Sequence, residues 1–248
     1  MLIVNKKIGE TPLETLDRLR RQKAKYLKEK LSYAGRLDPM AEGKMLVLAG
    51  EKENREREKY LRFDKEYIAE FVIGAETDSG DILGVVSRSG RNPSGGEILA
   101  GVIKKAVSGL RKIRRQKYPW FSGKTIGGVK MFELYKVGQT AGVRRPTLAV
   151  AIKRIGDLKI SFISSVALEK EILKKIALVR GDFRQKAIAK EWLEFFAGGS
   201  RKKFQRFSFR FRVSGGTFIR AFAEYFKKEF GAPVFLRRLK RTRIFSKI

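Results

Sequence analysis

The segment from Lys203 to Val213, KFQRFSFRFRV, constrains the fold more than any other part of the chain. Side chains two residues apart point to the same side of a strand, so strict alternation sorts them onto two faces. Four apolar side chains share one face and three polar ones share the other: Phe207, Phe209, Phe211 and Val213 against Ser208, Arg210 and Arg212. This pattern predicts a half-buried antiparallel strand.

The remaining elements are mixed in kind and follow no regular βαβ rhythm. Strands are predicted at 65–74 and within 147–163, and helices from Thr11 to about Leu31, at 98–107, at 168–179 and from Thr217 to Gly231. The Gly- and Ser-rich segment 87–97 is expected to be an irregular connection. Together these elements predict an α+β fold with a mostly antiparallel mixed sheet flanked by helices.

The charge of the chain points to a polyanionic partner. Lys and Arg number 56 against 26 acidic residues, which leaves a formal charge of +30. Such an excess would destabilise the folded state by self-repulsion unless a polyanion neutralised it. Nucleic acid is therefore the expected partner, although charge alone does not choose between kinds of nucleic acid.

The residue types that are absent narrow the possible chemistry. The sequence contains no Cys and no His, which excludes disulfides, thiolate nucleophiles, Cys-based zinc sites and a histidine base. Catalysis would have to use carboxylates, Lys, Tyr, Ser, Thr or Arg. The sequence also has neither a long apolar run nor a signal peptide, so a cytoplasmic protein without membrane contact is expected.

The segment LSYAGRLDPMAEGKMLVL, residues 31–48, is the strongest candidate for a catalytic loop. Taken by itself, Asp38 before a proline indicates only a turn, or an aspartate that caps a helix. However, Gly35-x-Leu37-Asp38-Pro39-x-Ala41-x-Gly43 resembles the TruB family's GHTGxLDPxAxG loop, in which the aspartate is the essential residue. Tyr33 stands where that family has a histidine.

Further segments resemble the same family in the same order. They are Lys6-x-x-Gly9-x-Thr11, Lys65-x-Tyr67, Ile73-Gly74-x-x-Thr77-Asp78-Ser79-Gly80-Asp81, Gln116-x-x-Pro119-x-Phe121-Ser122, Val213-Ser214-x-Gly216-Thr217-Phe218-Ile219-Arg220 and Leu236-Arg237-Arg238. The resemblance therefore runs from about Lys6 to Phe245, nearly the whole chain.

The resemblance implies a role for each candidate site residue. Asp38 would be the catalytic carboxylate, Arg220 would pair with it and orient it, and Tyr67 would stack on the target base. The expected substrate-binding residues are Lys6, Gly9, Tyr33, Arg36, Leu37 and Leu236 around the pocket, with Lys124 and Lys130 suited to phosphate contacts. Whether Asp38 acts as nucleophile or base stays open.

The resemblance also implies the overall organisation and the substrate. A pseudouridine synthase fold is expected over residues 1–248 as one catalytic domain, with an RNA-gripping insertion at about 109–145 and no C-terminal PUA domain. The implied substrate is the T arm of tRNA, with the uridine at position 55 as target. A monomer that uses no cofactor, no metal and no guide RNA is expected.

Two other functions remain as alternatives at this point. A metal-dependent nuclease could use Asp78 and Asp81 with a nearby Glu as magnesium ligands. A non-catalytic chaperone that binds and folds tRNA would also explain the charge. Retention of Asp38, Tyr67 and Arg220 together favours the enzyme, because binding alone needs no carboxylate in a pocket.

Overall fold

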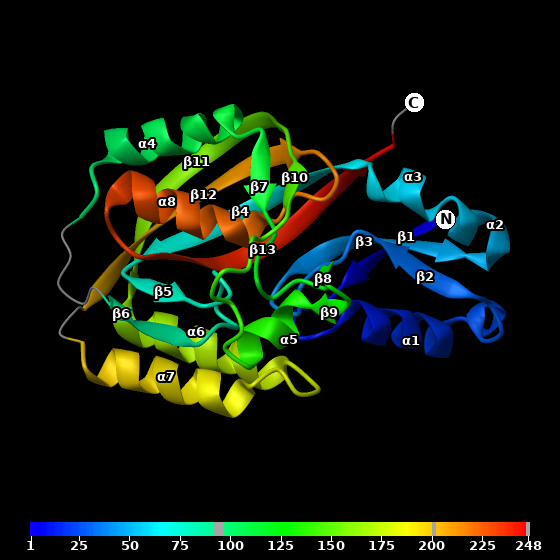
Figure 1. The fold of residues 1–248 in the computed structure, drawn as a ribbon, viewed down its shortest axis with the longest axis horizontal. Helices are drawn as coiled ribbons and strands as arrows, with labels where there is room; N and C mark the ends of the chain where they lie inside the picture. The colour runs from blue at the N-terminus through cyan, green and yellow to red at the C-terminus, as the bar shows by residue number, and fades with distance from the viewer. Residues whose placement is uncertain (92–96, 200–201, 247–248) are drawn as a thin grey trace.

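A seven-stranded sheet forms the centre of the computed structural model, which describes residues 1–91, 97–199 and 202–246 (Figure 1). The strand order is β1-β3-β13-β4-β12-β11, with β2 paired to β3. The strands are β1 (Leu2–Lys6), β2 (Leu31–Ala34), β3 (Glu42–Ala49), β4 (Asp64–Ile73), β11 (Ile152–Ser164), β12 (Lys203–Val213) and β13 (Val234–Phe245). Neighbouring strands run antiparallel except β13 and β3, which are parallel. The predicted α+β class with a mostly antiparallel sheet is confirmed.

Among the described residues, three two-stranded sheets lie outside this sheet. They are β5 (Ala75–Thr77) with β6 (Val86–Arg91), β7 (Arg115–Lys117) with β10 (Thr147–Ala149), and β8 (Thr125–Ile126) with β9 (Val129–Lys130). The expectation of an irregular connection over 87–97 is wrong for its first part, which belongs to β6. Residues 92–96 of that segment lie outside the described residues.

The helices are placed around the sheet and at its ends. They are α1 (Pro12–Gln22), α2 (Gly50–Arg55), α3 (Arg57–Leu61), α4 (Ala100–Gly109), α5 (Met131–Lys136), α6 (Ser165–Leu178), α7 (Gln185–Ala197) and α8 (Phe222–Phe230), with 3₁₀ turns at Ala24–Tyr26, Leu110–Lys112 and Ile219–Ala221. In the part of the chain that is described, no helix has both the length and the apolar character needed to cross a membrane.

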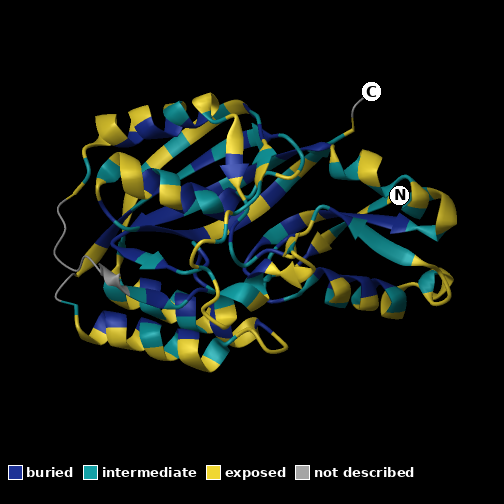
Figure 2. Ribbon diagram, in the orientation of Figure 1, coloured by how far each residue is buried: buried dark blue, intermediate teal, exposed yellow. Residues whose placement is uncertain are grey.

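The aromatic face of β12 is the main core of the molecule. The rings of Phe207 and Phe71, which are register partners on β12 and β4, stack at 5.6 Å, and Phe226 of α8 meets Phe207 edge-on at 4.9 Å. All three side chains are fully buried. Each contributes roughly 1.5–3 kcal/mol by leaving water. Figure 2 shows this dark-blue interior behind helices whose outer surfaces are exposed.

The hairpin of α6 and α7 packs on the opposite face of the same sheet. Trp192 of α7 is fully buried against Phe235 of β13, with ring centroids 5.0 Å apart. Next to it, the buried guanidinium of Arg237 pairs with Glu70 of β4 and Glu171 of α6. The central strands are therefore covered by helices on both sides, α8 on one and α6–α7 on the other.

Two predicted helices have different limits in the structure. The capping box at Thr11 forms as expected, but α1 ends at Gln22 rather than near Leu31, which lies in β2. The helix expected from Thr217 begins instead at Phe222, after a 3₁₀ turn, and Gly231 ends it with φ of +61°. The sequence analysis missed α7 altogether.

Candidate active site

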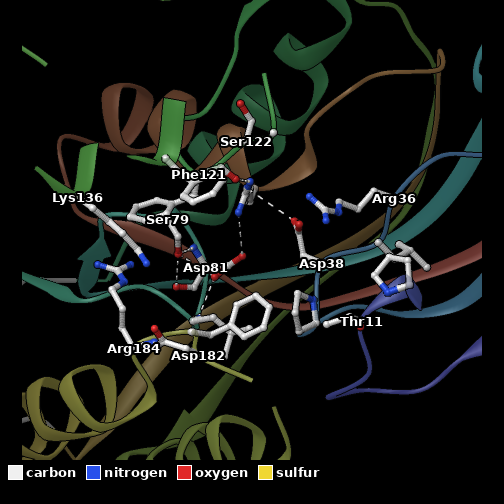
Figure 3. A pocket seen from close by; sticks show the side chains of 18 residues that line it. Thr11, Arg36, Asp38, Ser79, Asp81, Phe121, Ser122, Lys136, Asp182 and Arg184 are labelled. Atoms are coloured by element: carbon white, nitrogen blue, oxygen red, sulfur yellow. Dashed lines mark hydrogen bonds and ion pairs between the residues drawn. The ribbon is translucent and has the colours of Figure 1, made fainter. Parts of the chain in front are cut away.

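A pocket of about 360 Å³ brings together side chains from six distant parts of the chain (Figure 3). It lies between the start of α1, the β2–β3 loop, the loop after β5, the insertion that carries α5, the α6–α7 loop and the turn before α8. Its lining residues are Thr11, Pro12, Arg36, Leu37, Asp38, Pro39, Ser79, Asp81, Leu83, Phe121, Ser122, Gly123, Phe132, Lys136, Asp182, Phe183, Arg184 and Arg220.

Glycines at both ends of the Asp38 loop set its path. Gly35 has φ of +85° and Gly43 has φ of +106°, a region that other residues rarely adopt. A Cβ atom on Gly43 would also lie 2.3 Å from the carbonyl oxygen of Arg241, in the adjacent strand β13. Only glycine allows the loop to enter β3 at this close approach.

The buried side chain of Arg241 fixes the start of the same loop. Its Nη1 donates to the carbonyl oxygen of Gly35 at 2.9 Å, and its Nη2 to that of Arg36 at 3.0 Å. Further bonds run from Nη1 to the carbonyl of Lys44 at 3.3 Å and from Nε to the hydroxyl of Tyr67 at 3.0 Å. The planar guanidinium thus holds the backbone before and after Asp38, a role that the sequence analysis did not foresee.

The predicted residues Lys6 and Gly9 do not line the pocket but bind the backbone of the Asp38 loop. Lys6 is 1% exposed, and its ammonium donates to the carbonyl oxygen of Ala41 at 2.6 Å. Burial lowers the pKa of Lys6 to about 8, an effect that the negative charge of Asp38 opposes. The backbone N–H of Gly9 donates to the carbonyl of Pro39 at 2.8 Å. Both residues therefore position the loop.

Arg220 stands between two carboxylates. Its Nε lies 3.7 Å from Oδ2 of Asp38, and its Nη1 lies 3.9 Å from Oδ2 of Asp81. Its Nη2 donates to the carbonyl oxygen of Phe121, which ties it to the insertion. The pairing of Asp38 and Arg220 expected from the sequence is thus present, with Asp81 as a second acidic partner.

Asp81 is buried much more deeply than Asp38. Its side chain is 2% exposed, whereas that of Asp38 is 31% exposed. Oδ1 of Asp81 accepts hydrogen bonds from Ser79 Oγ at 2.8 Å and from the N–H of Leu83 at 2.9 Å. Burial raises the pKa of Asp81 to about 6, because the loss of water outweighs the opposing effect of Arg220. The sequence analysis considered Asp81 only as a metal ligand.

The two acidic residues considered as metal ligands are each paired with an arginine. Asp81 faces Arg220, and Asp78 forms an ion pair with Arg184 at 2.8 Å. Within the described residues, no three His, Cys, Asp or Glu side chains come together as a group that could hold a metal ion. The arrangement of ligands that the nuclease alternative requires is therefore not found in this part of the chain.

Three predicted residues lie behind the pocket surface. Tyr67 is 5% exposed, and its hydroxyl accepts the bond from Arg241. Leu236 is fully buried, and its N–H donates to the carbonyl of Gly80 at 2.9 Å, which anchors the loop that carries Asp81. Tyr33 is half-buried on β2, among the side chains that pack beneath α1. None of the three belongs to the residues that line the pocket.

The predicted basic residues are exposed on the insertion and at the pocket rim. Lys124 and Lys130 are exposed, at the two ends of the β8–β9 hairpin. Arg36 and Lys136 line the pocket itself, and Leu37 lies buried next to Asp38. Arg36 and Lys136 thus place positive charge in the wall of the pocket.

Comparison with known proteins assigns the chain to a family. The model of the TruB family pseudouridylate synthase (N terminal domain) matches residues 22–174, which include the Asp38 loop. The chain belongs to the TruB family. The similarity to this family inferred from the Asp38 loop and its companion segments is confirmed.

Individual TruB relatives share moderate identity with this chain. A tRNA pseudouridine synthase B of Protochlamydia amoebophila (strain UWE25) is 37% identical over 139 residues, which are 56% of this chain and 50% of that protein. One from Chlamydia muridarum (strain MoPn / Nigg) is 27% identical over 216 residues, 87% of this chain and 69% of that protein. The chain therefore matches about half of the length of the first of these relatives.

A solved structure supports the fold. The chain in "Crystal Structure of a Cbf5-Nop10-Gar1 Complex" superimposes with a TM-score of 0.51 at 16% sequence identity. The match covers 98% of this chain and 48% of that chain. At this identity the likeness concerns the fold alone, and it confirms the expected pseudouridine synthase architecture.

Proposed function

We propose that this protein is a tRNA pseudouridine synthase in which Asp38 is the catalytic carboxylate. The observation that carries the proposal is the position of Arg220, 3.7 Å from Asp38 and 3.9 Å from Asp81 in one pocket. Membership of the TruB family, and relatives named tRNA pseudouridine synthase B, support the choice of reaction and substrate.

The reaction rearranges bonds within one nucleotide. The N1–C1′ bond of a uridine breaks, the uracil turns, C1′ joins C5, N1 gains a proton, and the proton of C5 leaves for solvent. The target base must first leave its stack and enter the pocket. Asp38 is a partly exposed carboxylate of the pocket that pairs with Arg220, and there it can act on the nucleotide as nucleophile or as base.

Arg220 lies where it can orient Asp38. Two of its nitrogens are held by Asp81 and by the carbonyl of Phe121, so the guanidinium plane is fixed. Among the described residues, its buried Nε has no hydrogen-bond partner, since Asp38 is beyond normal bonding distance. This enclosed N–H faces Asp38, and it would gain a partner if the carboxylate moved closer.

The finer features of the substrate follow from the family resemblance and remain proposals. They are the T arm as binding partner, its uridine 55 as target, a monomer acting without a guide RNA, and a single domain with the insertion at about 109–145 gripping the RNA. Lys124 and Lys130 would contact phosphates. Stacking of Tyr67 on the target base would require the RNA to displace the side chains that cover its ring.

The test measures the proton that leaves C5. Purified protein is incubated, with EDTA present, with unmodified tRNA transcript tritiated at uracil C5, and released tritium is counted. We expect release by the wild type, no release by Asp38→Ala, and unchanged release by Asp17→Ala, which removes a carboxylate that is 55% exposed on α1. A wild type that binds tRNA without releasing tritium would refute the proposal and favour a chaperone.

A further inference from the structure

The α6–α7 hairpin lies between two strands that are direct neighbours. Ser164 at the end of β11 is the register partner of Lys203 at the start of β12. The match to the family model ends at residue 174, inside α6, so the loop at the tip of the hairpin lies beyond it. Yet this tip contributes Asp182, Phe183 and Arg184 to the pocket.

Arg184 holds the tip in place. Its guanidinium forms two hydrogen bonds to the carboxylate of Asp78, at 2.8 and 3.3 Å, and lies 4.4 Å from the ring centroid of Phe121. Its backbone has φ of 62°, a left-handed conformation that costs a non-glycine residue about 1–3 kcal/mol. The contacts to the Asp78 loop and to the insertion maintain this conformation, which suggests that the exact position of the tip matters.

Phe183, the neighbouring residue, keeps part of its aromatic ring exposed on the wall of the pocket. It is 37% exposed, and it belongs to none of the hydrophobic clusters of the described core. Exposed aromatic rings are the usual surface on which proteins stack unpaired RNA bases. The wall of the pocket thus offers a stacking surface that nothing in the resemblance anticipates.

We propose that the tip of the α6–α7 hairpin is part of the RNA-binding site, with Phe183 stacking against a base of the substrate strand. Arg184 is the positioning residue that fixes the ring. The choice of an unstacked RNA base as the ligand depends on the proposed function, because a flipped uridine leaves the bases beside it unstacked. Phe183 would receive such a base, which makes it a determinant of affinity and of the sequence next to the target.

The surroundings of the tip fit a nucleic acid. In Figure 3, Arg184 and Lys136 lie across the pocket from Asp38 and Arg36. Figure 1 shows the α6–α7 loop reaching toward α5, the helix that ends with Lys136. Asp182 is the negative side chain of the tip, and its Oδ1 accepts the N–H of Arg184. A strand that enters between these walls meets cations on both sides.

The experiment separates binding from chemistry. The dissociation constant for unmodified tRNA transcript is measured in the Asp38→Asn background, and kcat and KM are measured by tritium release in the otherwise wild-type protein. The variants are Phe183→Ala, Phe183→Leu and Phe183→Tyr. Leu193→Ala serves as control, since it removes another partly exposed apolar side chain, 46% exposed, from α7.

A stacking role predicts a specific pattern. Since one stacked base contributes about 1–3 kcal/mol, Phe183→Ala should raise Kd and KM about tenfold and leave kcat within about twofold. Phe183→Leu should bind as poorly as Phe183→Ala, whereas Phe183→Tyr and Leu193→Ala should bind like the wild type. Equal binding by Phe183→Ala and wild type, or full binding by Phe183→Leu, would overturn the inference. Absence of tritium release from the wild type would count against the proposed function, and the Kd comparison would still test Phe183.

Discussion

Replacing Arg241 by Lys tests whether its guanidinium holds the catalytic loop. The side chain is 2% exposed and donates to the carbonyl oxygens of Gly35, Arg36 and Lys44 and to the hydroxyl of Tyr67. A lysine keeps the positive charge but offers its donors from one atom instead of a planar fork. It can therefore satisfy only some of these oxygens.

The size of the effect follows from the bonds that are lost. A hydrogen bond to a charged group contributes about 1.5–3 kcal/mol, so losing two of the four would cost about 3–6 kcal/mol if nothing relaxed. Allowing for relaxation, we expect Arg241→Lys to lower the free energy of unfolding by about 3 kcal/mol. A shift of the Asp38 carboxylate by about 1 Å would lower kcat about 100-fold.

Two assays check this expectation. Urea unfolding followed by circular dichroism gives the stability, and tritium release gives kcat, so the first result does not depend on the proposed function. Arg243→Lys is the matched control, because Arg243 lies on the same strand but is exposed, and it should stay within about 0.5 kcal/mol of the wild type. If Arg241→Lys unfolds at the wild-type urea concentration and keeps its kcat, the clamp does not position the loop.

The remaining predictions concern pH and backbone conformation. Burial raises the pKa of Asp81 from 3.8 to about 6, so the folded protein keeps a proton there that the unfolded chain has lost. Its contribution to stability therefore falls as pH rises from about 4 to about 6, by about 3 kcal/mol. Asn at position 81 cannot titrate. The free energy of unfolding of Asp81→Asn, measured in urea, should therefore rise relative to that of the wild type between about pH 4 and about pH 6. A difference that stays constant over this range would contradict the raised pKa of Asp81. Gly43 has φ of +106°, and a Cβ there would lie 2.3 Å from the carbonyl oxygen of Arg241. Gly43→Ala should therefore lower the free energy of unfolding by about 3 kcal/mol or more. Gly101 lies on α4 with open space around it, so Gly101→Ala should raise the free energy of unfolding by up to about 1 kcal/mol. Equal urea midpoints for Gly43→Ala and Gly101→Ala would refute the close approach of Gly43 to Arg241.

The sequence predicted those parts of the fold that a local pattern specifies. The alternation in β12 and the capping box of α1 are local signals, and both features form where expected. The end of α1 was misplaced because Leu27 and Leu31 continue the helical spacing by chance. Leu31 belongs to β2, where pairing with Ala49 of β3 decides its conformation.

The role of Arg241 was hidden for a different reason. Arginines occur at 237, 238, 241 and 243 of β13, and no local pattern separates them. Irregularities in the pairing with β4, between Leu236 and Arg238 and between Arg241 and Arg243, decide which of them are buried. Such irregularities depend on the partner strand, so only the assembled sheet shows that Arg237 and Arg241 point inward.

Of the candidate site, the sequence placed Asp38 and Arg220 together, because their motifs resemble those of a known family. The contact between Asp81 and Arg220 was not predicted, because it forms only when β13 holds the loop after β5 in place. The tip of the α6–α7 hairpin was also missed. Nothing in residues 180–184 signals a pocket until the hairpin has packed on the sheet.

The way in which the α6–α7 hairpin joins the sheet has an evolutionary consequence. The hairpin leaves and re-enters at one spot, where the N–H of Ser165 donates to the carbonyl of Lys202 at 2.9 Å. Another segment could take its place without altering the register of any strand, provided that it also covered the sheet face on which Trp192 packs. One wall of the pocket is thus a segment that natural selection could exchange, lengthen or alter while Asp38, Asp81 and Arg220 stayed in place. Substrate preference could then diverge without a change in the reaction.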